Sequence, residues 1–214
     1  MNDIPRSRGR PRTFDRDEAL KTAMLLFWRH GYDGVPVAQL AAAMGIATAS
    51  LYVAFGSKET LYREALQSYL SNLGRLGVEA LEGSASAREG VRTLLHTAAS
   101  AFTRPGLPPG CMVGVGALRC AEQNRVAEEA TADLRSLSTK ALSRRIERAR
   151  RDGELGKDVS VQALTDFYGT VIEGMSVQAC DGVSRERLVR VADAAMTAWP
   201  AQNALGRRQV RAPR

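Results

Sequence analysis

Two short apolar segments, residues 37–44 and 48–55, meet at Gly45 and constrain the fold of this chain more than any other feature. Each segment has the length of about two helical turns. Pro36 suits the first turn of the first helix, because its missing amide proton would be unpaired there anyway. Gly45 provides the backbone freedom that a turn between two helices requires. The pattern predicts two short helices, ending at about Met44 and beginning again at about Thr48.

The predicted seam between these helices consists of Leu40, Ile46 and Leu51, and Ala41 is small enough to let the helices cross closely. Two helices that cross steeply leave the second one free to enter the major groove of DNA, whose width admits one helix. A helical hairpin without DNA contacts is the alternative on this spacing alone. The segment therefore favours a helix-turn-helix.

Three further features favour DNA as the partner. An arginine-rich arm precedes the first helix, where arginines can follow phosphates or enter a minor groove. A solvated tail is the alternative for such a like-charged run. Tyr52 can offer its hydroxyl to a phosphate, and Lys58 adds charge at a helix N-terminus that already favours anions. The residues expected to contact double-stranded DNA are Arg8, Arg10, Arg12, Val37, Thr48, Ala49, Ser50, Tyr52, Val53 and Lys58.

The composition predicts an all-α fold. Aromatic residues make up only 6% of the 214 residues, while Ala and Leu, which lose little entropy in helices, are abundant. Asp15 and Glu18 have the spacing of a capping box at the start of the first helix, and Ser57 has the place of an N-cap before a long fourth helix that carries apolar residues as far as Leu73. The other helices are expected at about 16–30, 88–103, 112–122, 125–151, 160–179 and 185–199.

Charge and cysteine content limit the class of protein further. The net charge of +7 is concentrated in arginines at both ends of the chain. Localised positive charge of this kind is typical of proteins that bind a polyanion. No apolar run reaches the ~18 residues of a membrane span, and no apolar segment follows the first arginines as in a signal peptide. Three cysteines without a paired spacing indicate free thiols in the cytoplasm. Redox sensing by Cys111 or Cys120 is an open alternative.

Several separate blocks of residues resemble the tetracycline-repressor-like (TetR) family in order and spacing. They are Gly31-Tyr32, residues 40–46, residues 50–55 and Gly56-Ser57-Lys58-Glu59, so the resemblance covers about residues 12–66. It implies a basic arm at 1–14, a helix-turn-helix DNA-binding domain at 15–57 and a ligand-binding and dimerisation domain at 58–200, followed by a basic tail at 201–214. The chain departs from the family at Ala47, where Ser or Thr is common, and at Val53 and Ala54, where an aromatic residue or His is common.

The resemblance also implies an effector cavity between the later helices and a homodimer formed by the last two. The residues expected to line the cavity are Phe102, Met112, Val115, Leu118, Cys120, Tyr168 and Ile172. The residues expected in the dimer interface are Phe167, Val171, Gly174, Met175, Gln178, Leu188, Val191 and Ala195. Packing within one chain is the alternative for the residues predicted in the dimer interface. Glu173 either binds a cationic effector or faces solvent.

The chain lacks the sequence patterns of an enzyme. Residues 114–119 resemble a GxGxxG loop, but Arg119 replaces the last glycine and no strand is predicted before it. We therefore expect no catalytic residues, no cofactor and no metal site. The prediction is a ligand-responsive regulator, a repressor that binds a palindromic operator as a dimer and is released by an unidentified small molecule. A sequence-tolerant DNA-organising protein without an effector is the alternative.

Overall fold

A computed structural model describes residues 14–200, and within that range it consists of helices and loops without strands. The all-α prediction is confirmed. The helices of the first part are α1 (Arg16–His30), α2 (Val37–Met44), α3 (Thr48–Phe55) and α4 (Lys58–Tyr69), a π-helical turn at Leu70–Gly74, and α5 (Arg75–Glu82). The helices of the second part are α6 (Ala87–Phe102), α7 (Met112–Val115), α8 (Arg125–Arg151), α9 (Val161–Cys180) and α10 (Arg185–Ala195), with 3-10 turns at Glu122–Asn124 and Met196–Ala198.

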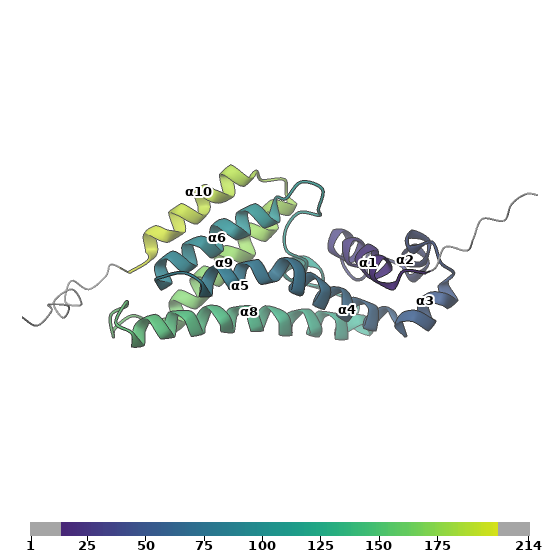
Figure 1. Cartoon of the computed structure of the whole chain (residues 1–214), viewed down its shortest axis with the longest axis horizontal. Helices are drawn as coiled ribbons and strands as arrows, with labels where there is room; N and C mark the ends of the chain where they lie inside the picture. Colours follow the sequence, from purple (N-terminus) through teal and green to yellow (C-terminus); the bar gives the residue numbers. More distant parts are fainter. Residues whose placement is uncertain (1–13, 201–214) are drawn as a thin grey trace, which may run out of the picture.

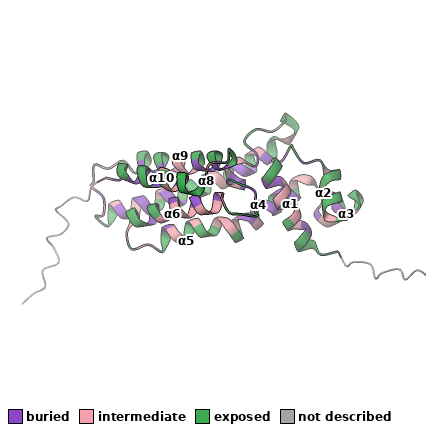
Figure 2. Cartoon of the chain, turned by 90° about the horizontal axis from the view of Figure 1, so that it is seen from above, coloured by how far each residue is buried: buried purple, intermediate pink, exposed green. Residues whose placement is uncertain are grey.

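The molecule is elongated, with α1, α2 and α3 gathered at one end and α10 toward the other (Figure 1). The 27-residue helix α8 runs along its length beneath α4 and α5. Buried residues face the interior of the bundle, and exposed residues cover its outer surfaces (Figure 2). Helix α4 joins the end that holds α2 and α3 to the rest of the molecule.

Two hydrophobic clusters form the core. The first unites α1 to α4 with α7 and the beginning of α8, and Phe27, Leu40, Leu51 and Tyr62 are fully buried within it. The second joins α5, α6, α9 and α10 to the C-terminal half of α8. Cys111 packs against both clusters. Cys111 therefore lies where the two clusters meet.

Side-chain caps set the beginnings of most long helices, as their sequences predict. Asp15 accepts hydrogen bonds from the amides of Asp17 and Glu18, and Ser57 accepts one from the amide of Thr60. The predicted capping box is incomplete, because the Glu18 carboxylate pairs with Lys21 instead of returning to the cap. Such caps satisfy amides that the first turn leaves without a partner.

The prediction of a helix over 112–122 is wrong, because α7 ends at Val115. The following backbone is held by residues far away in sequence. The amide of Tyr32 donates to the carbonyl of Gly116 at 2.9 Å, and the amide of Ala121 donates to the Asp33 carboxylate at 2.6 Å. These bonds from the α1–α2 turn occupy groups that a longer helix would have used internally.

The predicted long fourth helix is interrupted. Regular α-helix ends at Tyr69, and a π-helical turn covers Leu70–Gly74 before α5 begins. The last predicted helix ends at Ala195 and continues only as a 3-10 turn. No single helix between residues 14 and 200 is long and apolar enough to cross a membrane. Only α2 and α3 taken together reach that length and composition, and they are bent by 91°.

Candidate nucleic-acid interface and adjoining cavity

Helices α2 and α3 pack through the predicted seam. Leu40 and Leu51 are fully buried and Ile46 is half-buried. Gly45 closes α2 in the left-handed conformation, with φ 70° and ψ 29°, and its amide donates to the carbonyl of Ala42. A side chain at this position would be strained by the positive φ. The turn therefore sets the steep crossing that lifts α3 away from the rest of the molecule.

The outward face of α3 is exposed along its whole length (Figure 2). Val53 is 89% exposed and Tyr52 is 47% exposed, and the small residues Thr48, Ala49 and Ser50 precede them at the open end of the helix. Ala47 gives α3 no side-chain cap, so its first amides remain available to an anion. Val37, also predicted to contact DNA, is half-buried at the start of α2.

Lys58 lies at the start of α4 but packs inward. Its Nζ lies 4.2 Å from the centroid of the Tyr32 ring, a cation–π distance. Burial lowers the pKa of Lys58, and the negative charge of Asp33 partly opposes that effect. In the free protein Lys58 thus stabilises the α1–α2 turn. The predicted arm residues Arg8, Arg10 and Arg12 lie outside the described residues.

Arg16 supports α3 from behind, a role that the sequence did not indicate. Its guanidinium lies 4.6 Å from the Phe55 ring centroid and pairs with Glu64 of α4 at 2.8 Å. Its Nε donates to the carbonyl of Ala54 at 3.4 Å. Arg16 thereby ties α1, α3 and α4 together beside the exposed face.

Aromatic side chains connect this end of the molecule to α4 and α8. The Tyr62 ring lies 5.0 Å from the rings of Phe27 and Tyr32, and its hydroxyl shares a hydrogen bond with Thr131 of α8 at 3.0 Å. Burial raises the pKa of Tyr62 to about 12, so its hydroxyl keeps its proton at neutral pH. Helix α4 is therefore held between α1 and α8.

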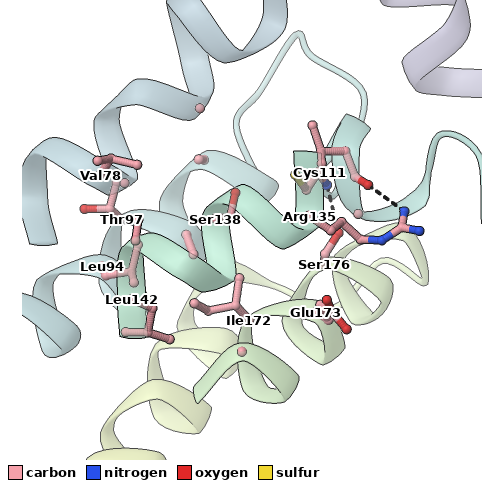
Figure 3. Close-up of a pocket in the computed structure, with 18 of the residues that line it drawn as sticks. Val78, Leu94, Thr97, Cys111, Arg135, Ser138, Leu142, Ile172, Glu173 and Ser176 are labelled. Atoms are coloured by element: carbon pink, nitrogen blue, oxygen red, sulfur yellow. Dashed lines mark hydrogen bonds between the residues drawn. The ribbon is translucent and has the colours of Figure 1, made fainter. Parts of the chain in front are cut away.

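A cavity of about 180 Å³ lies between α4, α5, α6, α7, α8 and α9. Val78, Leu94 and Leu142 form part of an apolar end, and Cys111 and Ser176 lie at the opposite end (Figure 3). Tyr69 and the π-helical turn Leu70–Gly74 contribute to the wall. The end of α4 therefore borders directly on the cavity.

Two charged side chains, Arg135 and Glu173, also belong to this wall. Arg135 donates from Nη1 to the carbonyl of Val113 at 3.1 Å and so joins α8 to α7. Glu173 is exposed on α9. The Cys111 amide donates to the Ser176 hydroxyl oxygen at 2.8 Å. Arg135 and Ser176 have no distinguishing pattern in the sequence, because their role depends on the packing of three helices.

Of the residues predicted to line the cavity, Phe102 and Ile172 are in its wall, and the other five are placed elsewhere. Met112 is fully buried in the first core cluster, and Tyr168 is buried in the second, where its hydroxyl donates to the carbonyl of Ala195 at 3.3 Å. Val115, Leu118 and Cys120 were assigned from a helix that continued to residue 122. Because α7 ends early, Val115 and Leu118 lie at a separate surface groove beside the α1–α2 turn, and the Cys120 amide bonds to Glu128.

The predicted dimer residues divide into two sets. Phe167, Gly174 and Gln178 lie on the exposed face of α9, with Val171 half-buried beside them and Val177, which the prediction omitted, also exposed. Met175, Leu188 and Ala195 are buried within the chain, and Val191 is half-buried. The first three belong to the second core cluster and Val191 packs against it, so packing within one chain accounts for them.

Cys111, Cys120 and Cys180 are free thiols. Burial raises the pKa of the Cys120 thiol, and the carboxylates of Asp33 and Glu128 raise it further. Between residues 14 and 200, no group of three or more His, Cys, Asp or Glu side chains has an arrangement that could hold a metal ion.

Comparisons with known proteins agree with this arrangement. Residues 19–65 match the family model of bacterial regulatory proteins of the tetR family. The transcriptional repressor BdcR of Escherichia coli (strain K12) is 32% identical over 86% of this chain and 88% of its own length. The transcriptional repressor ComR of the same strain is 29% identical over 92% of this chain and 94% of its own length.

Solved structures show the same similarity. A cysteine mutant of the TetR family transcriptional regulator CifR, complexed with 26-base-pair operator DNA, is 46% identical, with a TM-score of 0.85 over 89% of this chain and 100% of the other. A TetR regulator of Chloroflexus aurantiacus is 21% identical with a TM-score of 0.75 over 85% of this chain and 92% of the other, which shows the shared fold. This chain belongs to the TetR family and is a DNA-binding transcriptional regulator.

Proposed function

We propose that this protein represses transcription by binding a palindromic operator as a homodimer, and that a small molecule in the cavity releases it. We assign residues 15–57 to DNA binding and residues 58–200 to ligand binding and dimerisation. The observation that carries the proposal is the exposed outward face of α3 on a tightly packed helix pair. The related regulator CifR has been solved on operator DNA, and BdcR and ComR are repressors.

DNA recognition is proposed to depend on the first turns of α3. Thr48, Ala49 and Ser50 offer two hydroxyls and small surfaces, which suits a few hydrogen bonds to base edges and contact with thymine methyl groups. Tyr52 has its hydroxyl available to a phosphate. Arg8, Arg10, Arg12, Val37, Val53 and Lys58 complete the proposed contact set. Phosphate contacts set the position of the protein on DNA, while base contacts select the sequence.

The exposed face of α9 is the proposed dimer surface. Phe167 is 41% exposed there, and around Gly174 there is open space within 4 Å of an added Cβ. A partner helix could therefore approach closely. A symmetric dimer presents two copies of α3 about one DNA turn apart, or a multiple of it, which requires a palindromic site.

Release by an effector is proposed to act through α4. Tyr69 ends this helix and belongs to the cavity wall, and its ring lies 5.0 Å from that of Trp28 in α1. A ligand that fits the cavity better in a tilted position of α4 would change the separation of the two reading helices. Because coupling is reciprocal, a ligand that prefers this tilted state by about 1–3 kcal/mol weakens operator binding by the same free energy.

The surfaces described here suit binding rather than chemistry, so we propose that the protein has no catalytic activity. A regulator of bacterial type that acts on chromosomal DNA works in the cytoplasm, which is the proposed location. Free thiols agree with a reducing compartment.

The test is selection of bound sequences from random DNA, followed by fluorescence anisotropy with the selected site. We expect one palindromic sequence, bound by a dimer in light-scattering measurements. Val53→Asp places a negative charge on the exposed face of α3 and should abolish binding, whereas Leu76→Asp, at a 44% exposed position on α5, should not. Equal affinity for all sequences would favour a DNA-organising protein instead.

A further inference from the structure

The cavity has a composition that restricts the chemistry of its ligand. Its volume of about 180 Å³ slightly exceeds the ~150 Å³ that accommodates benzene in an engineered protein cavity. The ligand is therefore a small molecule, of about the size of a substituted benzene ring. Most of its wall is apolar, and Leu94, Leu142 and Ile172 are part of this apolar surface (Figure 3).

The charged groups of the wall do not offer a site for an ion. Arg135 and Glu173 have opposite signs, so together they add no net charge. Arg135 turns its guanidinium away from the apolar end of the cavity, toward the Val113 carbonyl at 3.1 Å (Figure 3), and Glu173 is exposed to solvent. An unpaired charge moved from water into apolar surroundings costs several kcal/mol. This cavity consequently disfavours both anionic and cationic ligands.

The wall holds the polar side chains Thr97, Ser138 and Thr139 as well as Ser176, and Ser176 is the most deeply buried of these four. Ser176 is 1% exposed, and its oxygen accepts a hydrogen bond from the Cys111 amide at 2.8 Å. Within residues 14–200 its hydroxyl accepts this bond but donates none. A buried donor without an acceptor is costly. An oxygen atom of a ligand would supply the missing acceptor.

We infer that the cavity binds a small, neutral, largely apolar molecule that carries a hydrogen-bond-accepting oxygen, such as an alcohol, a ketone or an ether. Ser176 donates to this oxygen, and the apolar part lies against Leu94, Leu142 and Ile172. The inference rests on the proposed function, since it names the class of effector for the same cavity. The ligand also touches Tyr69 and the π-helical turn, which are the elements proposed to pass its effect to DNA.

The test uses four probes of nearly equal shape, namely benzyl alcohol, toluene, benzoate and benzylammonium. Each is titrated calorimetrically into the full chain without DNA. We expect benzyl alcohol to bind at least tenfold more tightly than either ion. Ser176→Ala should weaken the binding of benzyl alcohol about fivefold, the effect of one neutral hydrogen bond. The affinity for toluene should be unchanged.

A second variant tests the location of the ligand. Gly169 belongs to the cavity wall, and an added Cβ there meets nothing within 4 Å. Gly169→Leu should therefore fill the cavity and abolish binding of both neutral probes. The control is Ala132→Leu at an exposed position on α8, which should bind them normally. Thermal unfolding of both variants checks that they are folded.

Three results would overturn the inference. The first is tighter binding of benzoate or benzylammonium than of benzyl alcohol. The second is an equal loss of affinity for toluene and for benzyl alcohol in Ser176→Ala. The third is that no probe binds to the folded protein. Operator binding is measured separately on the same preparations. If the operator is bound while the probes fail, the proposed effector class is wrong and the proposed DNA-binding function stands.

Discussion

The hydroxyl of Tyr69 donates a hydrogen bond to the sulfur of Cys111 at 3.4 Å, in the wall between the cavity and the DNA-binding end of the molecule. Burial raises the pKa of Tyr69, and the neighbouring thiol raises it further. The hydroxyl therefore stays protonated and remains a donor at neutral pH. Because Cys111 also bonds to Ser176 through its amide, a short chain of contacts joins the proposed ligand donor to the last residue of α4.

Tyr69→Phe removes this hydroxyl and leaves the ring against Trp28. We expect the free energy of unfolding to fall by about 0.5–1.5 kcal/mol, the usual net contribution of one buried hydrogen bond. Urea denaturation measures the change. Tyr52→Phe is the matched control. The Tyr52 side chain is exposed, so removal of its hydroxyl should change the free energy of unfolding little. Equal stability of Tyr69→Phe and the wild type would show that the bond to sulfur contributes nothing.

Asp33 connects the α1–α2 turn to the segment before α8. Its carboxylate accepts from the Ala121 amide and from the Asn124 side chain, each at 2.6 Å. Asp33→Ala removes both acceptor oxygens, so both bonds are lost. We expect hydrogen exchange at the Ala121 amide to accelerate about tenfold. Asp133→Ala, an exposed change on α8, should leave that rate unaltered. An unchanged rate in Asp33→Ala would mean that other contacts hold the segment.

Lys58 provides a prediction that depends on pH. Burial lowers the pKa of Lys58, so its positive charge is lost at a lower pH than the ~10.4 of free lysine. If Lys58 contacts a phosphate, Lys58→Ala should reduce the salt dependence of operator binding by about one unit of log–log slope. The slope of the wild type should approach that of Lys58→Ala as the pH rises through the lowered pKa.

Lys58→Arg is the matched control, because arginine keeps its charge at all these pH values. Its salt dependence should stay constant as the pH rises from neutral toward the pKa of free lysine, while that of the wild type declines. Operator titrations at several salt concentrations give the slopes. A wild-type slope that equals that of Lys58→Ala already at pH 7.5 would assign Lys58 only to the packing against Tyr32.

Two changes on α3 should separate phosphate contacts from base contacts. Tyr52→Phe removes a hydroxyl at an exposed position, and we expect a loss of about 1–2 kcal/mol in operator binding if it bonds a phosphate. Ser50→Ala should instead change the preferred base at one position of the operator. Anisotropy against the operator and its single-base variants distinguishes the two. Normal binding by Tyr52→Phe would remove that hydroxyl from the contact set.

The exposed face of α9 predicts the effect of one charge on dimerisation. Phe167→Asp puts a carboxylate on the proposed interface, and we expect the dimer dissociation constant to rise at least tenfold, since buried aromatic residues dominate such interfaces. Sedimentation velocity measures the change. Leu137→Asp, at a 57% exposed position on α8, is the control and should remain dimeric. A dimer that tolerates Phe167→Asp would place the interface on another surface.

The sequence by itself determined the elements whose causes are local. Gly45 with Leu40 and Leu51 predicts the crossed pair α2 and α3, because a turn residue and a helical spacing act within a few residues. Asp15 and Ser57 mark helix beginnings through bonds to amides two or three residues away. The same local causes indicated the exposed residues of α3, since the buried seam of an eight-residue helix leaves its other face to solvent.

Only the tertiary structure decided where α7 ends and which side chains line the cavity. The segment after Val115 is held by Tyr32 and Asp33, more than eighty residues earlier, and no local pattern reports such bonds. Ser176 and Gly169 come to the cavity with residues of α4, α5, α6, α7, α8 and the π-helical turn, so their role depends on how whole helices pack. Tyr168 and its neighbour Gly169 have the same apolar surroundings in sequence, but the direction of each side chain from α9 places one in the core and the other at the cavity.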